Sequence, residues 1–286
     1  MISFGASMFF TDYAARPEEI GPALEQRGFD SVWAPEHSHI PVSRSTEFPA
    51  GGELPKKYYD AMDPFVALAA VGAVTRTLKL GTGVCLIAQR DPIQTAKLVA
   101  SIDQVSRGRF LFGIGNGWNR DEMENHGTAF ATRHKRARET VEAMTAIWTR
   151  DVAEYHGEII DFGPMNAWPK PVQKPRPPVY VGGAFPYSAR RAIRYADGWL
   201  PQAARAGSYR QIGDLIPEFH RMAREAGRDP ASIAITVWHS RRDPDLIRRY
   251  RDMGVERVVF ALESAPLAEL MPRIEAIAEM MHQVNQ

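Results

Sequence analysis

The chain has 286 residues, 44% of them hydrophobic, and carries 35 Lys and Arg against 34 Asp and Glu. Because the charges nearly balance, the composition argues against a protein that binds nucleic acid or an anionic membrane surface. The single cysteine, Cys85, excludes an intramolecular disulfide, and its apolar surroundings indicate a buried thiol in a reducing compartment. No apolar run reaches the roughly 18 residues that span a bilayer, and the N-terminus lacks a basic signal segment, so we expect a cytoplasmic protein.

Short apolar, β-rich runs alternate with longer amphipathic runs along the whole chain, which is typical of βα units built around parallel strands. Asp63-Pro64 and Asp91-Pro92 each offer a helix cap followed by proline. The expected strands are Ile2–Ser7, Ser31–Ala34, Leu78–Val84, Phe110–Gly115, Val179–Gly182, Gly198–Leu200, Ile233–Trp238 and Arg257–Ala261. The expected helices are Pro17–Arg27, Asp63–Thr75, Asp91–Ser106, Thr132–Thr149, Tyr187–Tyr195, Ser208–Ala226, Pro244–Met253 and Leu267–Val284.

This alternation fits both a closed eight-stranded barrel and a doubly wound open sheet. The count favours the barrel, and barrels of about 250 residues commonly fold as one domain. We therefore predict a single α/β (β/α)₈ TIM-barrel domain over residues 1–286, with its site at the carboxyl ends of the strands. Three long connections, 37–61, 116–131 and 150–178, are expected to be lids or binding loops, the last with a small hairpin near residues 155–158.

The second expected strand ends in Glu36 and His37, with His39 two residues on. His37 is our first candidate for catalysis, because an imidazole gains and loses protons near neutral pH, and Glu36 could hold its tautomer or bind a hydroxyl. One alternative is that these are solvated loop residues. Another is a metal site formed with His39, but only His239 of the remaining histidines falls near another strand end, so we predict no metal.

Glycines interrupt the third and fourth expected strands. Gly81 and Gly83 lie inside the third, where glycine often marks a bulge or the close approach of a ligand. The fourth ends in a GxGxG pattern before Trp118, but no obvious helix opens there, so a Rossmann fingerprint is poorly supported. Contact between this backbone and a cofactor is still expected.

The fifth expected strand ends in Gly182-Gly183, just before a helix. Exposed N–H groups at a helix N-terminus, together with the helix dipole, favour a phosphate. Arg190 and Arg191 lie in the first turns of that helix, where they either support the phosphate or face solvent.

Together these stretches resemble the luciferase-like monooxygenase family, and particularly its branch that uses the deazaflavin coenzyme F420. The resemblance spans nearly the whole chain and implies a flavin-type cofactor at the barrel mouth, hydride transfer to or from a small organic substrate, and a homodimer. The stretches that carry it are Leu80–Val84, Asp91-Pro92 through Asp103–Phe110, Gly113–Trp118, Tyr180–Gly183 and Tyr195–Trp199.

Carried over by position, the resemblance implies that His37 is the catalytic histidine and that Glu36 stands in the place of a cofactor-contacting acid. It also implies a cis peptide between Gly83 and Val84, beneath the cofactor ring. The other cofactor-binding residues that it implies are Asn116, at the ring or ribityl chain, and Gly182 and Gly183, at the phosphate.

Trp118 departs from one branch of the family, since sugar-phosphate dehydrogenases carry a glutamate after the glycine of the fourth strand. The indole argues against that substrate and that base, and predicts a substrate with an apolar or aromatic portion. Our functional prediction is an F420-dependent oxidoreductase. The alternatives are an FMN-dependent monooxygenase served by a partner flavin reductase, a non-catalytic flavin-binding barrel, and a metal-dependent hydrolase built on His37 and His39.

Overall fold

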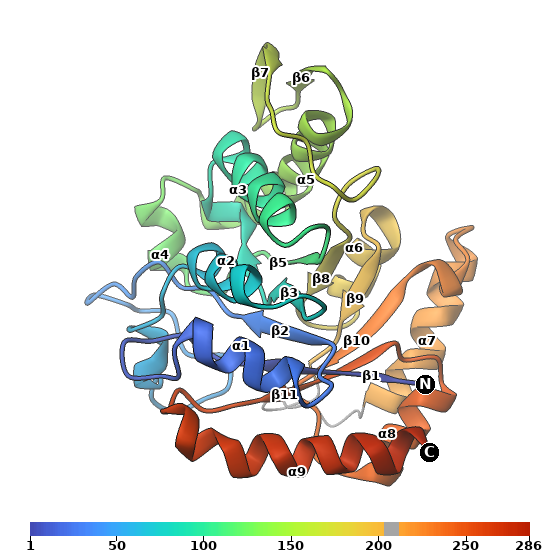
Figure 1. Ribbon diagram of the computed structural model, residues 1–286. Coiled ribbons are helices and arrows are strands. Elements are labelled where there is room, and N and C mark those ends of the chain that lie inside the picture. Colours follow the sequence, from blue (N-terminus) through green and yellow to red (C-terminus); the bar gives the residue numbers. More distant parts are fainter. Residues whose placement is uncertain (203–211) are drawn as a thin grey trace.

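Parallel strand pairing runs without a break around a closed barrel, in the order β1, β2, β3, β5, β8, β9, β10, β11 and back to β1 (Figure 1). The computed structural model describes residues 1–202 and 212–286. The predicted (β/α)₈ architecture is confirmed. The barrel strands are β1 (Ser3–Ser7), β2 (Ser31–Ala34), β3 (Lys79–Thr82), β5 (Phe110–Gly115), β8 (Val179–Gly182), β9 (Gly198–Leu200), β10 (Ala234–Trp238) and β11 (Arg257–Ala261).

Helices cover the outside of these strands, as Figure 1 shows for α1, α2, α3 and α9. The side chains of Asp63 and Asp91 accept hydrogen bonds from backbone N–H groups of the helices that follow them, so both predicted caps are confirmed. The helices are α1 (Pro17–Glu25), α2 (Pro64–Val74), α3 (Pro92–Val105), α4 (Arg120–Asn125), α5 (Arg133–Thr149), α6 (Tyr187–Tyr195), α7 (Ile212–Glu225), α8 (Pro244–Asp252) and α9 (Leu267–Asn285).

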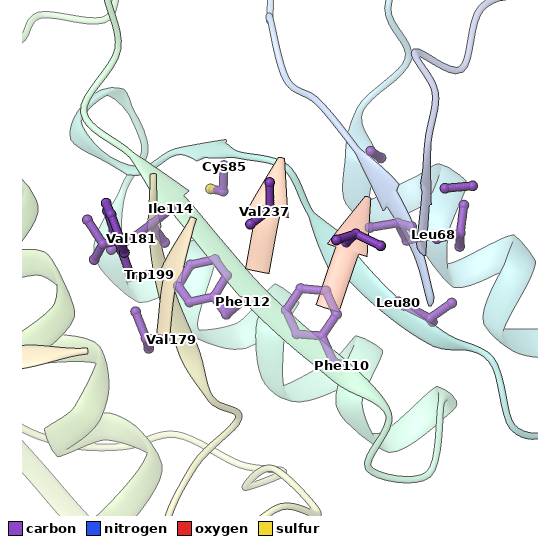
Figure 2. Close-up of a cluster of buried hydrophobic side chains, with 14 of the residues drawn as sticks. Leu68, Leu80, Cys85, Phe110, Phe112, Ile114, Val179, Val181, Trp199 and Val237 are labelled. Atoms are coloured by element: carbon purple, nitrogen blue, oxygen red, sulfur yellow. The ribbon is translucent and has the colours of Figure 1, made fainter. Parts of the chain in front are cut away.

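Buried side chains fill both faces of the sheet, as expected of parallel strands covered on both sides. Between strands and helices, Phe110 and Phe112 belong to the large cluster drawn in Figure 2. Inside the barrel, Trp33 lies edge-on to Tyr180 and Trp238, at ring distances of 6.0 and 5.9 Å. This inner aromatic layer closes the barrel beneath its mouth.

Gly81 shows why glycine occurs inside β3. A Cβ at this position would lie 2.2 Å from the Trp33 ring, so the close approach is made by the inner aromatic layer. Cys85 is fully buried, as expected, and burial raises the pKa of its thiol. It begins a two-residue strand, β4 (Cys85–Leu86), that extends the pairing of β3 with β5.

The long connections contain more regular structure than the sequence indicated. The hairpin is present as β6 (Val152–His156) and β7 (Asp161–Asn166), which confirms it. The 116–131 connection contains α4, which the sequence analysis missed, and short 3₁₀ turns occur at Lys56–Tyr58, Ile87–Gln89, Phe130–Thr132 and Pro230–Ser232. The expected start of a helix at Ser208 lies outside the described residues. In the described ranges no helix has the length and apolar character needed to cross a membrane.

Candidate active site

A cavity of about 730 Å³ opens at the carboxyl ends of the strands. Residues at or just beyond the ends of seven barrel strands and from the 37–61 connection line it, which is where an active site of this architecture is expected. Every residue that the sequence analysis proposed for the site lies on this cavity: Glu36, His37, Gly83, Val84, Asn116, Gly182 and Gly183.

His37 lies just beyond β2 with 7% of its surface exposed. Its Nδ1 is 2.6 Å from Oε2 of Glu122 in α4. The other Glu122 oxygen, Oε1, accepts hydrogen bonds from Nε2 of Gln89 at 2.9 Å and from the backbone N–H of Ser38 at 3.1 Å. Because Nδ1 is bound to Glu122, Nε2 is the His37 nitrogen left to act on a molecule in the cavity.

Glu122 is 1% exposed, and its ionisation depends on these contacts. Burial raises the pKa of its carboxyl, but the hydrogen bond with His37 opposes burial, as do the donors on Gln89 and Ser38. The net result is a pKa below the ordinary value for glutamate. The His37 imidazole therefore rests against a carboxylate rather than a neutral acid.

Glu36 has a different environment although it precedes His37 in the chain. One of its oxygens accepts the backbone N–H of Leu86 at 2.8 Å, and the other accepts Nε of Arg90 at 2.6 Å. Arg90 also donates to Asp63 at 2.6 Å. Glu36 therefore fixes the wall of the cavity through protein contacts, and a direct contact between Glu36 and a cofactor stays a prediction.

The Gly83–Val84 peptide bond on the cavity wall is cis, as the resemblance implied. A Cβ at Gly83 would lie 2.1 Å from the Trp238 ring. A Cβ at Gly115 would lie 2.4 Å from a methyl group of Val84. Glycine at both positions therefore lets the Val84 side chain sit at the cavity surface, between the ends of β5 and β8.

Positively charged side chains gather at one end of the cavity, near β5 and β8. Nε of Arg133 and Nε of Arg191 are buried without a hydrogen-bond partner. Within residues 1–202 and 212–286 no carboxylate lies within 4.0 Å of either guanidinium. Arg191 lies close to Gly183, whose φ of +127° favours glycine. The predicted phosphate site therefore has cationic side chains that no carboxylate neutralises.

Two neutral polar side chains adjoin these arginines. Asn116 Nδ2 lies 2.6 Å from Nδ1 of His134, and Asn116 Oδ1 is buried without a partner. Burial, followed by the charges of Arg133 and Arg191, lowers the pKa of His134 to about 4, so this imidazole is neutral at pH 7. We call Asn116, Arg133, His134, Gly183 and Arg191 the cationic half of the cavity.

Aromatic side chains surround His37 at the other end. Its ring centre lies 5.3 Å from that of Tyr58 and 5.7 Å from that of Trp118. Tyr58 in turn packs against Phe9 at 4.6 Å. Burial raises the pKa of Tyr58, so its hydroxyl stays protonated at neutral pH. We call Phe9, His37, Tyr58, Trp118 and His239 the aromatic half of the cavity.

Sequence reasoning missed four residues that shape the site. Glu122 lies in the helix that was not predicted, and Gln89 lies in a short turn after β4. Arg133 and His134 open α5, where a basic pair at a helix start gave no reason to expect a binding residue. For Arg191, the sequence left open whether the side chain binds a phosphate or faces solvent. Its position near Gly183 favours the binding role.

The two imidazoles considered for a metal site have separate partners. Nδ1 of His37 is bound to Glu122. The ring nitrogens of His39 instead lie 2.9 Å from Oγ of Ser38 and 2.9 Å from Nδ2 of Asn125. In the part of the chain that the structure describes, no group of three or more His, Cys, Asp or Glu residues could hold a metal ion. The arrangement instead offers a proton-exchanging imidazole beside a cavity with one charged and one apolar end.

The barrel, the cis Gly83–Val84 peptide and the mouth cavity together point to one family of barrel proteins. A family model described as luciferase-like monooxygenase matches residues 11–272. The chain belongs to this family, whose members are oxidoreductases or monooxygenases.

Relatives within the family have different described functions. Protein Rv0953c of Mycobacterium tuberculosis, itself uncharacterised, is 37% identical over 96% of this chain and 97% of its own length. An F420-dependent hydroxymycolic acid dehydrogenase of the same organism is 30% identical over 74% of this chain and 54% of its own length. An FMNH₂-dependent dimethylsulfone monooxygenase of Pseudomonas putida is 31% identical over 46% of this chain and 37% of its own length.

Solved structures confirm the fold. Monooxygenase RslO1 from Streptomyces bottropensis superimposes with a TM-score of 0.78 at 20% identity, over 100% of both chains. An F420-dependent secondary alcohol dehydrogenase, solved with an F420–acetone adduct, superimposes with a TM-score of 0.74 at 19% identity, over 99% of both chains.

Proposed function

We propose that this protein transfers hydride between coenzyme F420 and a small organic substrate, with His37 exchanging the proton that accompanies the hydride. The observation that carries the proposal is the buried His37 imidazole, whose Nδ1 is bound to Glu122 and whose Nε2 is left for a ligand. A proton-exchanging group at this place suits a reaction in which a hydroxyl becomes a carbonyl or the reverse.

The residues of the cationic half fit an anionic cofactor. The Nε atoms of Arg133 and Arg191 and the Oδ1 of Asn116 are buried without partners, and such groups need a ligand or water to satisfy them. Backbone N–H groups at Gly182 and Gly183, just before α6, would hold a phosphate with these arginines. When bound, the deazaflavin would supply the two-electron hydride chemistry that the protein's own side chains lack.

The protein's residues then have separate tasks. Val84 and the Gly83–Val84 peptide would support the ring of a bound cofactor. Tyr58 and Trp118 exclude water from His37 and contact the apolar part of the substrate. His37 accepts a proton at Nε2 when the substrate is oxidised and returns it when the substrate is reduced.

A binding titration comes first, with coenzyme F420 and FMN compared on the purified protein by tryptophan fluorescence. We expect tighter binding of F420, and turnover of at least one compound in a panel of apolar alcohols. In His37→Ala that turnover should fall roughly 10²–10⁴-fold, the range for a lost general acid–base group, while F420 binding is unchanged. Binding of neither cofactor would contradict the proposal, and undiminished turnover in the variant would remove His37 from it.

An FMN-dependent monooxygenase is the second candidate, favoured by the similarity to the dimethylsulfone monooxygenase. Oxygen consumption with reduced FMN from an added flavin reductase distinguishes it, because hydride transfer through F420 consumes no oxygen. A barrel that binds F420 but turns over nothing in the panel would be a binding protein. The homodimer and the cytoplasmic location implied at the sequence level remain part of the proposal.

A further inference from the structure

Glu122 joins three neighbouring parts of the barrel mouth. Through its two oxygens it contacts His37 and Ser38 after β2 and Gln89 after β4, from its own place on α4 after β5. The side chains of Glu122 and Gln89 are both buried. The two oxygens do different things, since the N–H donors of Ser38 and Gln89 converge on Oε1 and Oε2 is left to His37.

We propose that Glu122 is the positioning residue of this site: it holds His37 in the tautomer protonated at Nδ1, so that Nε2 is a proton acceptor facing the cavity. This inference rests on the proposed function and specifies how His37 acts in it. A carboxylate has acceptor atoms only, so at 2.6 Å it requires a hydrogen on Nδ1. A neutral imidazole carries one proton, so Nε2 then presents a lone pair.

The surrounding charges support an ionised Glu122. The buried carboxylate of Glu36, on the same cavity wall, is paired with Arg90 at 2.6 Å. Ser38 Oγ lies 3.4 Å from Glu122 Oε1 and 2.7 Å from the imidazole of His126, which extends the polar contacts toward the surface. The N–H donors on Oε1 favour the charged form of Glu122.

This assignment sets the direction of proton movement. In oxidation of an alcohol, the C–H bond would break with its electron pair, and a bound oxidised deazaflavin would supply the acceptor for that hydride. The O–H bond breaks, its proton goes to Nε2 of His37, and the C=O bond forms. The resulting imidazolium is stabilised by Glu122 at Nδ1. Reduction of the ketone or aldehyde follows the same steps in reverse.

The substitution Glu122→Gln makes a sharp test because the side chain keeps its shape. Two N–H donors already converge on the Oε1 position, so the amide oxygen must stay there, and the amide NH₂ then faces Nδ1 of His37. An N–H donor requires Nδ1 to be the acceptor, which moves the His37 proton to Nε2. The variant therefore inverts the tautomer, whereas a merely structural role for Glu122 predicts no inversion.

Nitrogen NMR of histidine-labelled apoprotein measures the tautomer without cofactor or substrate, with the His37 signals identified by their absence in His37→Ala. We expect a protonated Nδ1 and an unprotonated Nε2 in the wild type, and the reverse in Glu122→Gln. Glu124→Gln, on the exposed side of the same helix, is the matched control and should leave the spectrum unchanged.

A wild-type protein with the proton on Nε2 would overturn the inference, even if the Glu122→Gln protein did not fold. So would a folded variant that kept the wild-type tautomer. In a turnover assay, Glu122→Gln should lower kcat roughly 10²–10⁴-fold with little change in KM or F420 binding. Absence of F420 binding by the wild type would contradict the proposed function alone, because the NMR result is obtained without the cofactor.

Discussion

The two halves of the cavity differ in how their polar groups are satisfied. In the aromatic half, Nδ1 of His37 is bound to Glu122 and the surrounding rings are packed against one another. In the cationic half, Arg133 and Arg191 have buried nitrogens without partners. The protein thus completes the reacting end by itself and leaves the charged end for a ligand to complete.

Because of this difference, we expect the two halves to control cofactor affinity and substrate turnover separately. Guanidinium groups that no carboxylate of the described residues neutralises favour anionic ligands, so we expect the cationic half to control how tightly a cofactor binds. A fixed imidazole among apolar rings favours only a substrate that can exchange a proton there. Changes in one half should therefore alter binding constants, and changes in the other should alter turnover.

The largest expected effect is a loss of cofactor affinity when both arginine side chains of the cationic half are removed. Arg133→Ala combined with Arg191→Ala deletes two charge-assisted contacts, each worth about 1.5–3 kcal/mol, so F420 affinity should fall about 10³-fold. The weakening should be measured by fluorescence titration at several salt concentrations, because the salt dependence should also decrease. Arg190→Ala, an exposed arginine on the same helix, is the control. Equal affinity in the double variant would mean that the cationic half does not bind the cofactor.

Acid should disturb the aromatic half through His239. Burial, helped by the charge of Lys57, lowers the pKa of this imidazole from 6.5 to about 4. The unfolded chain binds this proton below about pH 6.5 and the folded chain only near pH 4, so the free energy of unfolding falls as pH decreases through that range, by at most about 3 kcal/mol. His239→Asn suits the positive φ of 56° and should flatten this part of the profile.

Urea unfolding between pH 7 and pH 4 measures the effect of His239→Asn. The slope should not disappear entirely, because His134 has a pKa lowered to about 4 as well. His282→Asn, at an exposed position on α9, should leave the profile unchanged. An identical pH dependence in His239→Asn and the wild type would show that folding does not lower the pKa of His239.

The smallest effect should come from the apolar wall. Trp118→Ala removes the indole beside His37, and the loss of part of its contact with an apolar alcohol should raise KM roughly tenfold, or about 1.4 kcal/mol. Trp118→Phe keeps an aromatic wall and should recover most of the affinity. Steady-state kinetics with an alcohol from the panel provide the measurement, and an unchanged KM in Trp118→Ala would exclude the indole from the substrate site.

The barrel could be predicted because each strand carries its own signal. Ser31–Ala34, Phe110–Gly115 and Val179–Gly182 are fully buried, and such continuous apolar runs were assigned with their observed ends. The missed helix α4, by contrast, has six mostly polar residues, and among them only Met123 is apolar. A short helix held by polar side-chain contacts needs no apolar periodicity, so no periodic pattern marks it in the sequence.

The site was predictable where the backbone determines it and unpredictable where distant side chains meet. At Gly83 and Gly115 a Cβ would clash with a neighbouring side chain, and at Gly183 the φ of +127° favours glycine. Glycines at strand ends are visible in the sequence. Glu122 binds His37 across 85 positions of the chain, and nothing local to either residue indicates the pair. Arg133 is similar, because nothing near it in the sequence indicates that its Nε lies buried at the cavity without a hydrogen-bond partner.

One turn of α4 performs two anchoring tasks through adjacent residues. Glu122 holds His37, while Asp121 accepts hydrogen bonds from Ser45 and Thr46 in the 37–61 connection. That connection supplies Tyr58 to the aromatic half. Loop grafting between members of the family would therefore have to exchange α4 together with the loop, because a transplanted 37–61 segment that lost its hold on Asp121 would pull on the helix that orients the imidazole.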